Sequence, residues 1–131
     1  MGFGSVTSVV ESMGANLMAG PYLATQLATW AIVTSASEAQ KNEWLPAIVG
    51  GAPASVAITE PDGSWLMDEP SATGVVDADS VRLAGEKTFV LDLDGAALVL
   101  VSVMLDGDPR LINNFFGSIG LCRNLRLVQR D

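Results

Sequence analysis

The sequence predicts an α+β fold in which helices come first and an antiparallel β domain, a small barrel or sheet, follows. Apolar residues recur every three or four positions over the first fifty residues, the spacing drops to about two after Pro53, and closely spaced turn signals separate the later segments. These changes divide the chain into a helical part (1–52), a β domain (53–109) and a terminal stretch (110–131). Helices grouped before strands, without alternation, are typical of this class.

Three helices are expected in the first part. The first covers 5–17, and the second covers 22–34 and is apolar on nearly every side, which is typical of a helix buried between others. The third begins at Ser37, which forms a capping box with Gln40, and we expect a disruption near Pro46.

The β domain is expected to hold several short strands, over 55–60, 73–76, 80–83, 87–91 and 96–104. Turns are expected at Pro61-Asp62-Gly63, at Gly85 and at Asp106-Gly107-Asp108-Pro109, with an irregular loop over 65–70. Residues 110–131 match neither period. They are either a final strand with a tail or residues without a native partner, and the sequence leaves both open.

Composition excludes several classes of function. Seven Lys and Arg against fifteen Asp and Glu give a net charge of −8, which argues against a nucleic-acid partner because the phosphate backbone is also negative. The absence of His removes Ser-His-Asp triads and most zinc sites, and we expect no metal. No apolar run reaches the roughly 18–20 residues that span a bilayer, and no basic leader opens the chain, so we expect a cytoplasmic protein without a membrane span.

Few residues are candidates for chemistry. Most Asp residues lie at expected turns, where their side chains cap backbone N–H groups. Lys87 is interpreted as a solvated residue on the outer face of a strand, with a phosphate ligand as the alternative. Trp30 and Trp44 are interpreted as core residues. Thr59, followed by the Glu60-Pro61 turn, combines a hydroxyl with backbone amides at the edge of a sheet, where a flat polar ring system could bind.

Six short segments, in a shared order over roughly residues 8–104, are similar to the middle portion of the acyl-CoA dehydrogenase family. They are Glu11-Ser12-Met13-Gly14, Gly20-Pro21-Tyr22-Leu23-Ala24-Thr25, Ser37-Glu38-Ala39-Gln40-Lys41, Trp44-Leu45-Pro46, Ile58-Thr59-Glu60-Pro61 and Gly85-Glu86-Lys87-Thr88-Phe89-Val90. The resemblance implies the end of an N-terminal helical domain joined to a β domain. It also implies FAD as the cofactor.

The resemblance further implies which residues contact the isoalloxazine ring of FAD. The strand that ends in Thr59-Glu60-Pro61 supplies Val56, Ile58 and Thr59. The segment that follows Gly85-Glu86-Lys87 supplies Phe89, Val90 and Leu91. The family usually has Trp-Ile-Thr or Trp-Ile-Ser in the second segment, so Leu91 stands where a hydroxyl is expected. Similar Phe-Val versions occur in branches associated with steroid or CoA-thioester breakdown, some built from two unlike subunits.

The implied activity is the α,β-oxidation of an acyl-CoA thioester, with hydride transfer to flavin N5. The C-terminal helical domain that carries the family's catalytic base has no counterpart in this sequence. We therefore assign no catalytic residue and expect a fragment, truncated or frameshifted, that is inactive alone and forms homo- or hetero-oligomers with acyl-CoA dehydrogenase subunits. The alternatives are a non-catalytic subunit or remnant that pairs with a catalytic partner, and an unrelated small α+β domain.

Overall fold

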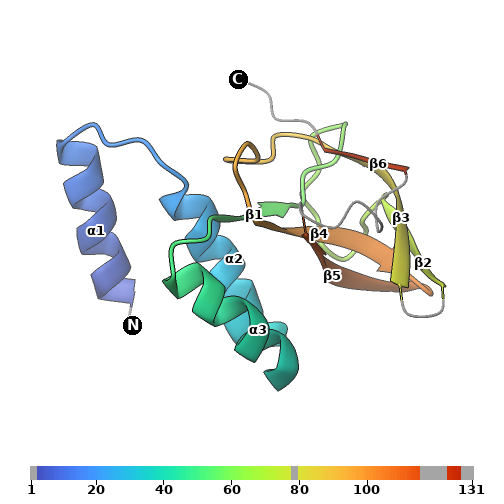
Figure 1. Ribbon diagram of the computed structural model, residues 1–131. Coiled ribbons are helices and arrows are strands. Elements are labelled where there is room, and N and C mark those ends of the chain that lie inside the picture. The colour runs from blue at the N-terminus through green and yellow to red at the C-terminus, as the bar shows by residue number, and fades with distance from the viewer. Residues whose placement is uncertain (1–2, 78–79, 116–123, 128–131) are drawn as a thin grey trace.

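The computed structural model describes residues 3–77, 80–115 and 124–127, and in this part three helices precede six strands (Figure 1). The helices are α1 (Phe3–Ala15), α2 (Tyr22–Ser35) and α3 (Glu38–Val49). The strands are β1 (Ala54–Ala57), β2 (Thr73–Asp77), β3 (Ser80–Lys87), β4 (Leu98–Leu105), β5 (Asp108–Phe115) and β6 (Asn124–Leu127). The predicted order of helices and then sheet is confirmed.

The strands form one mixed sheet, so the prediction of an antiparallel β domain is right about the sheet and only partly right about strand direction. β4 pairs antiparallel with β5 along its whole length, and β2 pairs antiparallel with β3. The pairs β1–β4, β2–β4 and β3–β6 are parallel. The long irregular connection over 58–72 allows β2 to run in the same direction as β1, and both strands are parallel to β4.

The third helix begins as predicted and continues where a disruption was expected. Ser37 accepts a hydrogen bond from the Gln40 N–H, and the Gln40 side chain accepts one from the Ser37 N–H, which completes the capping box. The disruption expected near Pro46 is wrong, because α3 runs through Pro46 to Val49. Pro46 is exposed, so water can reach the Asn42 carbonyl that proline leaves without an N–H partner.

Two predictions in the β domain are corrected by backbone geometry. Gly85 is not a turn: it lies within β3 with a φ of 138°. Residues 87–91 are not a strand, because Lys87 is the last residue of β3. Phe89 and Asp92, with φ of 52° and 48°, then turn the chain through the left-handed region.

The other turns and the loop agree with their predictions. The Gly63 N–H donates to the Glu60 carbonyl at 2.9 Å, and residues 65–70 are irregular. Asp106 and Gly107 both have positive φ and form a two-residue hairpin turn between β4 and β5. Part of 110–131 therefore lies in β5 and β6, while 116–123 and 128–131 lie outside the described residues.

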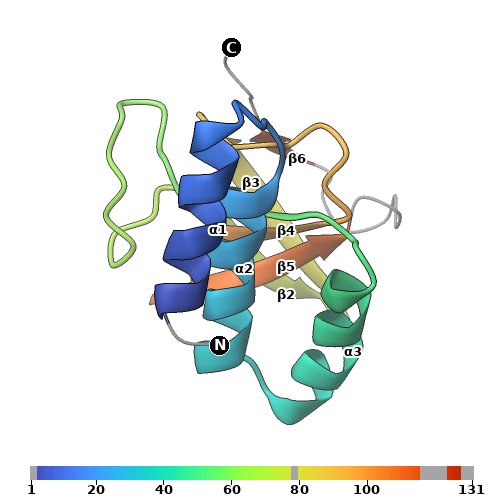
Figure 2. The same ribbon diagram turned by 90° about the vertical axis from the view of Figure 1, so that its left-hand side faces the viewer.

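Helices α2 and α3 cover one side of the sheet (Figure 2). Between them and the sheet lies the helix-side cluster, formed by Ala28, Ile32, Trp44, Ala54, Leu98 and Leu100. The opposite cluster is formed by Ala57, Ala72, Leu83, Val90, Ala96, Val99, Val101 and Val103. Trp44 packs in the helix-side cluster with Ile32 and Leu100, as a core residue should. The expectation of a fully buried second helix is wrong, and so is that of a core Trp30, whose side chain is 58% exposed. One stripe of α2 is buried, and its opposite apolar face has no cover among the described residues.

Helix α1 packs little against the rest of the described chain. Its apolar residues Val9 and Val10 are each more than 40% exposed, and Figure 1 shows α1 standing apart from α2 and α3. Among the described residues, no helix combines the length and the apolar character needed to cross a bilayer.

Candidate functional site

Two chain segments meet at the end of β1, although about thirty residues separate them in sequence. The Thr88 N–H donates to the Thr59 carbonyl at 2.8 Å, and the Thr88 hydroxyl donates to the Glu60 carbonyl at 2.9 Å. The Ser55 hydroxyl donates to the Leu91 carbonyl. These bonds hold residues 55–60 alongside residues 88–91, so the structure brings together both segments that the sequence singled out.

The six predicted site residues differ in how much of their side chains is accessible. Phe89 and Leu91 are 52% and 49% exposed, while Val90 between them is buried in the sheet core. Ile58 and Thr59 are half-buried. The exposed Phe89 and Leu91 side chains and the half-buried Ile58 and Thr59 are thus the parts of the two segments that a ligand could contact.

Val56 and Val90 contribute differently from the other four. The half-buried Val56 side chain packs against the helix-side cluster, and Val90 packs in the opposite cluster. Their side chains therefore anchor the two segments to the two halves of the core. A ligand would reach these residues mainly through their backbone.

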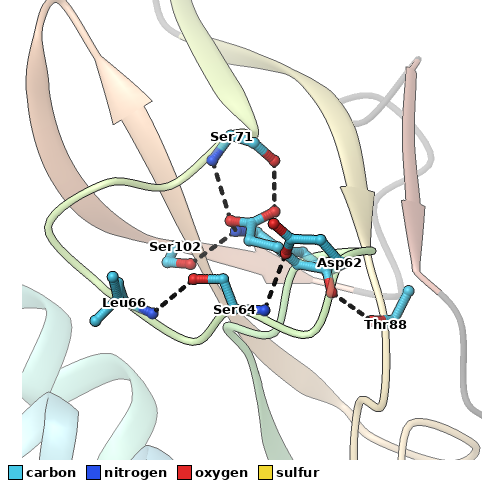
Figure 3. A network of polar contacts seen from close by, with 8 residues as sticks. Asp62, Ser64, Leu66, Ser71, Thr88 and Ser102 are labelled. Carbon is cyan, nitrogen blue, oxygen red and sulfur yellow. Dashed lines mark hydrogen bonds and ion pairs between the residues drawn. The ribbon is translucent and has the colours of Figure 1, made fainter.

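A buried charged network lies at the junction of the two segments (Figure 3). The Lys87 ammonium group donates to the Glu60 carboxylate and, at 2.9 Å, to the Ser102 hydroxyl. The Ser71 N–H and hydroxyl donate to the two oxygens of the same carboxylate at 3.0 and 2.5 Å. The two contacts of Lys87 join residues that are 27 and 15 positions apart in the sequence.

The interpretation of Lys87 as a solvated surface residue is wrong, because its side chain is 0% exposed. Burial of an ammonium group is costly unless a carboxylate and further hydrogen-bond partners accompany it, and Glu60 and Ser102 supply both. A signal for burial was present in the sequence. Lys87 has the same strand parity as Val81 and Leu83, which pack in the core.

The network sets the charge state of Glu60. Burial would raise the pKa of this carboxyl group, but hydrogen bonds from Lys87 and Ser71 and the charge of Lys87 together hold its pKa below the ordinary value of 4.5. Glu60 is therefore ionised at neutral pH. The two segments of the site are therefore joined by a buried ion pair between Lys87 and ionised Glu60.

The turn after Glu60 leads into an exposed loop. The Ser64 N–H donates to the Asp62 carboxylate at 2.9 Å, which confirms the turn-capping interpretation for this Asp. Trp65, Leu66 and Met67 follow on the loop that projects from the side of the molecule in Figure 2, and all three are exposed.

Among the described residues, no three His, Cys, Asp or Glu side chains are grouped as metal ligands.

A cavity elsewhere in the molecule is distinct from this site. It lies between α2, α3 and the sheet, where Ile32, Trp44 and Leu100 contribute to its lining. None of the six predicted site residues lines it.

A helical layer on a mixed sheet, with a polar and apolar surface where two segments meet, defines an α+β protein with a candidate ligand site at the end of its first strand. No protein-family model and no curated protein matches the sequence. Solved structures do. A variant of the Tcur3481-Tcur3483 steroid ACAD (acyl-CoA dehydrogenase) is 31% identical with a TM-score of 0.77, over 91% of this chain and 33% of that one.

Further solved structures match at lower identity. A glutaryl-CoA dehydrogenase from Mycobacterium smegmatis in complex with FADH2 is 27% identical with a TM-score of 0.60, over 71% of this chain and 24% of its own. The ChsE4-ChsE5 complex from Mycobacterium tuberculosis is 26% identical with a TM-score of 0.66, over 82% of this chain and 29% of that one. An acyl-CoA dehydrogenase from Geobacillus kaustophilus is 28% identical with a TM-score of 0.63, over 70% of this chain and 26% of that one.

These matches confirm the resemblance to the acyl-CoA dehydrogenase family, a family of oxidoreductases. The chain spans about a third or less of the length of each solved enzyme.

Proposed function

We propose that this chain is the flavin-contacting portion of an FAD-dependent acyl-CoA dehydrogenase. Val56, Ile58, Thr59, Phe89, Val90 and Leu91 would form one wall of the isoalloxazine site. The observation that carries this proposal is the hydrogen bond from the Thr88 N–H to the Thr59 carbonyl, which joins the two segments that the family resemblance assigns to the flavin.

The residues present fit a flavin ring. An isoalloxazine is a flat ring system with an apolar face and a polar edge, and the two joined segments offer exposed apolar Phe89 and Leu91 together with the half-buried hydroxyl residue Thr59. FAD, when bound, would supply the hydride acceptor for α,β-oxidation of an acyl-CoA thioester. The residues of this chain would bind and orient the ring, and the buried Lys87 and Glu60 side chains would not contact it.

We also propose that the working protein is an oligomer of acyl-CoA dehydrogenase subunits, with an acyl-CoA as substrate. One matched structure is described as a steroid enzyme and another as a complex of two named proteins, which supports a hetero-oligomer of unlike subunits. Neither description identifies the acyl group used here. A cytoplasmic location stays a prediction of the sequence.

A second candidate is a non-catalytic subunit that keeps the fold and pairs with a catalytic partner. Leu91 favours it, because its side chain is half exposed at the site and lacks the hydroxyl that the resemblance expects. In such a subunit, flavin would bind weakly or only in the presence of the partner.

Flavin binding by the protein, purified in its natural assembly, tests both candidates. We expect bound FAD with its visible absorbance, bleached on addition of an acyl-CoA. Thr59→Val should raise the Kd for FAD roughly two- to tenfold, as for the loss of one hydrogen bond. Thr29→Val is the matched control, because Thr29 is also half-buried but its hydroxyl donates to the Thr25 carbonyl within α2.

The outcomes separate the candidates. An assembly that holds FAD without bleaching supports the non-catalytic subunit. An assembly that holds no FAD contradicts the first proposal. An equal change in Kd for both Thr variants would remove Thr59 from the site.

A further inference from the structure

We propose that Lys87, through Glu60 and Ser102, is a positioning residue that holds the two site segments in register. The inference deepens the proposed function and rests on it where flavin binding is concerned. The clamping of the segments themselves rests on geometry alone. Lys87 is fully buried and does not belong to the site surface.

Lys87 and Glu60 are each the sequence neighbour of a residue that joins the two segments. Lys87 directly precedes Thr88, and Glu60 directly follows Thr59. The Thr88 N–H and the Thr59 carbonyl share the hydrogen bond that joins the segments. The Lys87–Glu60 ion pair therefore links the same two segments a second time, through side chains, one residue away from the backbone bond.

Further contacts tie this link to the centre of the sheet. Lys87 also donates to Ser102 in the central strand β4, and Glu60 accepts from the backbone and side chain of Ser71, just before β2. The Thr88 hydroxyl adds a bond to the Glu60 carbonyl. The turn after β1 and the end of β3 are thus fixed to each other and to β4.

Stability alone does not account for a buried ion pair here. Apolar residues of similar size often replace such pairs without loss of stability, so a buried pair contributes little net free energy of folding. Its specific effect is directional, because the hydrogen bonds that Lys87 donates to Glu60 and Ser102 fix the placement of these two residues relative to each other. That effect acts on the two segments that would touch the flavin.

The test uses the flavin-binding assembly and three variants. Lys87→Met removes the ammonium group at similar size, Ser102→Ala removes only one acceptor, and Glu60→Gln with Lys87→Met leaves no unpaired charge. Ile32→Ala is the control, because Ile32 is buried in the helix-side cluster and its truncation lowers stability without removing any hydrogen bond of the network. The readouts are the Kd for FAD, the visible circular dichroism of bound flavin, and the hydrogen-exchange rate of the Thr88 amide, all well below the Tm.

We expect Lys87→Met to raise the Kd for FAD about tenfold and Ser102→Ala roughly threefold, with faster Thr88 exchange in both. Ile32→Ala should lower the Tm and leave the Kd, the flavin spectrum and Thr88 exchange unchanged. The double variant should recover stability relative to Lys87→Met but keep the raised Kd, because Met has no donor with which to hold Ser102.

A double variant that recovers both stability and Kd would reduce Lys87 to charge compensation and overturn the proposal. Unchanged Thr88 exchange in folded Ser102→Ala and Lys87→Met would also overturn it. If the wild-type assembly binds no FAD, the proposed function fails, while the clamping of the two segments still stands or falls on Thr88 exchange.

Discussion

Gly85 in β3 lies directly against Ala72: a Cβ at position 85 would sit 2.8 Å from both the Cα and the Cβ of Ala72. Non-bonded carbon atoms do not approach this closely, and the φ of 138° at Gly85 is also unfavourable for any residue with a side chain. Glycine is therefore required here by close packing and by backbone conformation together. The contact holds the end of β3 against the chain entering β2, one residue from Ser71.

Replacement of Gly85 by Ala should destabilise the protein by roughly 2–4 kcal/mol, since strain and overpacking add. Gly63→Ala is the matched control, because Gly63 has a φ of 89° but open space around its Cα. It should cost only about 1 kcal/mol of strain. Urea unfolding measures both free energies, and equal losses would show that backbone conformation alone requires Gly85.

The stability of the protein should depend on the ionisation of Glu60. The pKa of this group is lower in the folded protein than its ordinary value of 4.5, so ionised Glu60 contributes stability above about pH 4.5. That contribution should be lost as the pH falls through the folded-state pKa. Glu60→Gln should thus be less stable than wild type at pH 7, and the difference should shrink towards pH 3.

Urea unfolding between pH 7 and pH 3 measures this dependence. Glu43→Gln, at an exposed position in α3, is the control and should follow the wild-type curve at every pH. A difference between Glu60→Gln and wild type that stays constant over the range would contradict the assigned role of Glu60.

The start of α3 should depend on Ser37. Ser37→Ala removes the side-chain acceptor of the Gln40 N–H, and loss of such a cap typically costs about 1 kcal/mol. Ser35→Ala, at the exposed end of α2, should change stability by less than about 0.5 kcal/mol. Equal effects of the two substitutions, measured by urea unfolding, would argue that the capping box contributes no stability.

Leu91 gives a prediction of gained rather than lost binding. If residues 88–91 contact the flavin, Leu91→Thr restores the hydroxyl that the resemblance expects, and we expect the Kd for FAD to fall roughly two- to tenfold. Leu23→Thr, on the exposed face of α2, is the control and should leave the Kd unchanged. A Kd that rises with Leu91→Thr would indicate that the apolar side chain itself contacts the ring.

Local signals predicted the parts of this protein that local interactions control. The capping box at Ser37 marked the start of α3, because its hydrogen bonds span only three residues. The order of helices and sheet followed from periodicity, and Thr59 was singled out as a strand-end residue with a family resemblance. The pairing of its segment with Phe89 and Leu91 followed from the resemblance, since nothing local links positions thirty residues apart.

Tertiary structure decided the rest. Local reasoning assigned Lys87 to the surface and Gly85 to a turn, but their partners, Glu60 and Ala72, lie 27 and 13 residues away in the chain. The parallel strand pairs and the exposed face of α2 likewise depend on how distant elements pack. The type of a residue sets the free-energy cost of burying it. Only its neighbours in the folded protein decide whether a charged side chain such as Lys87 is buried with an oppositely charged partner or stays in water.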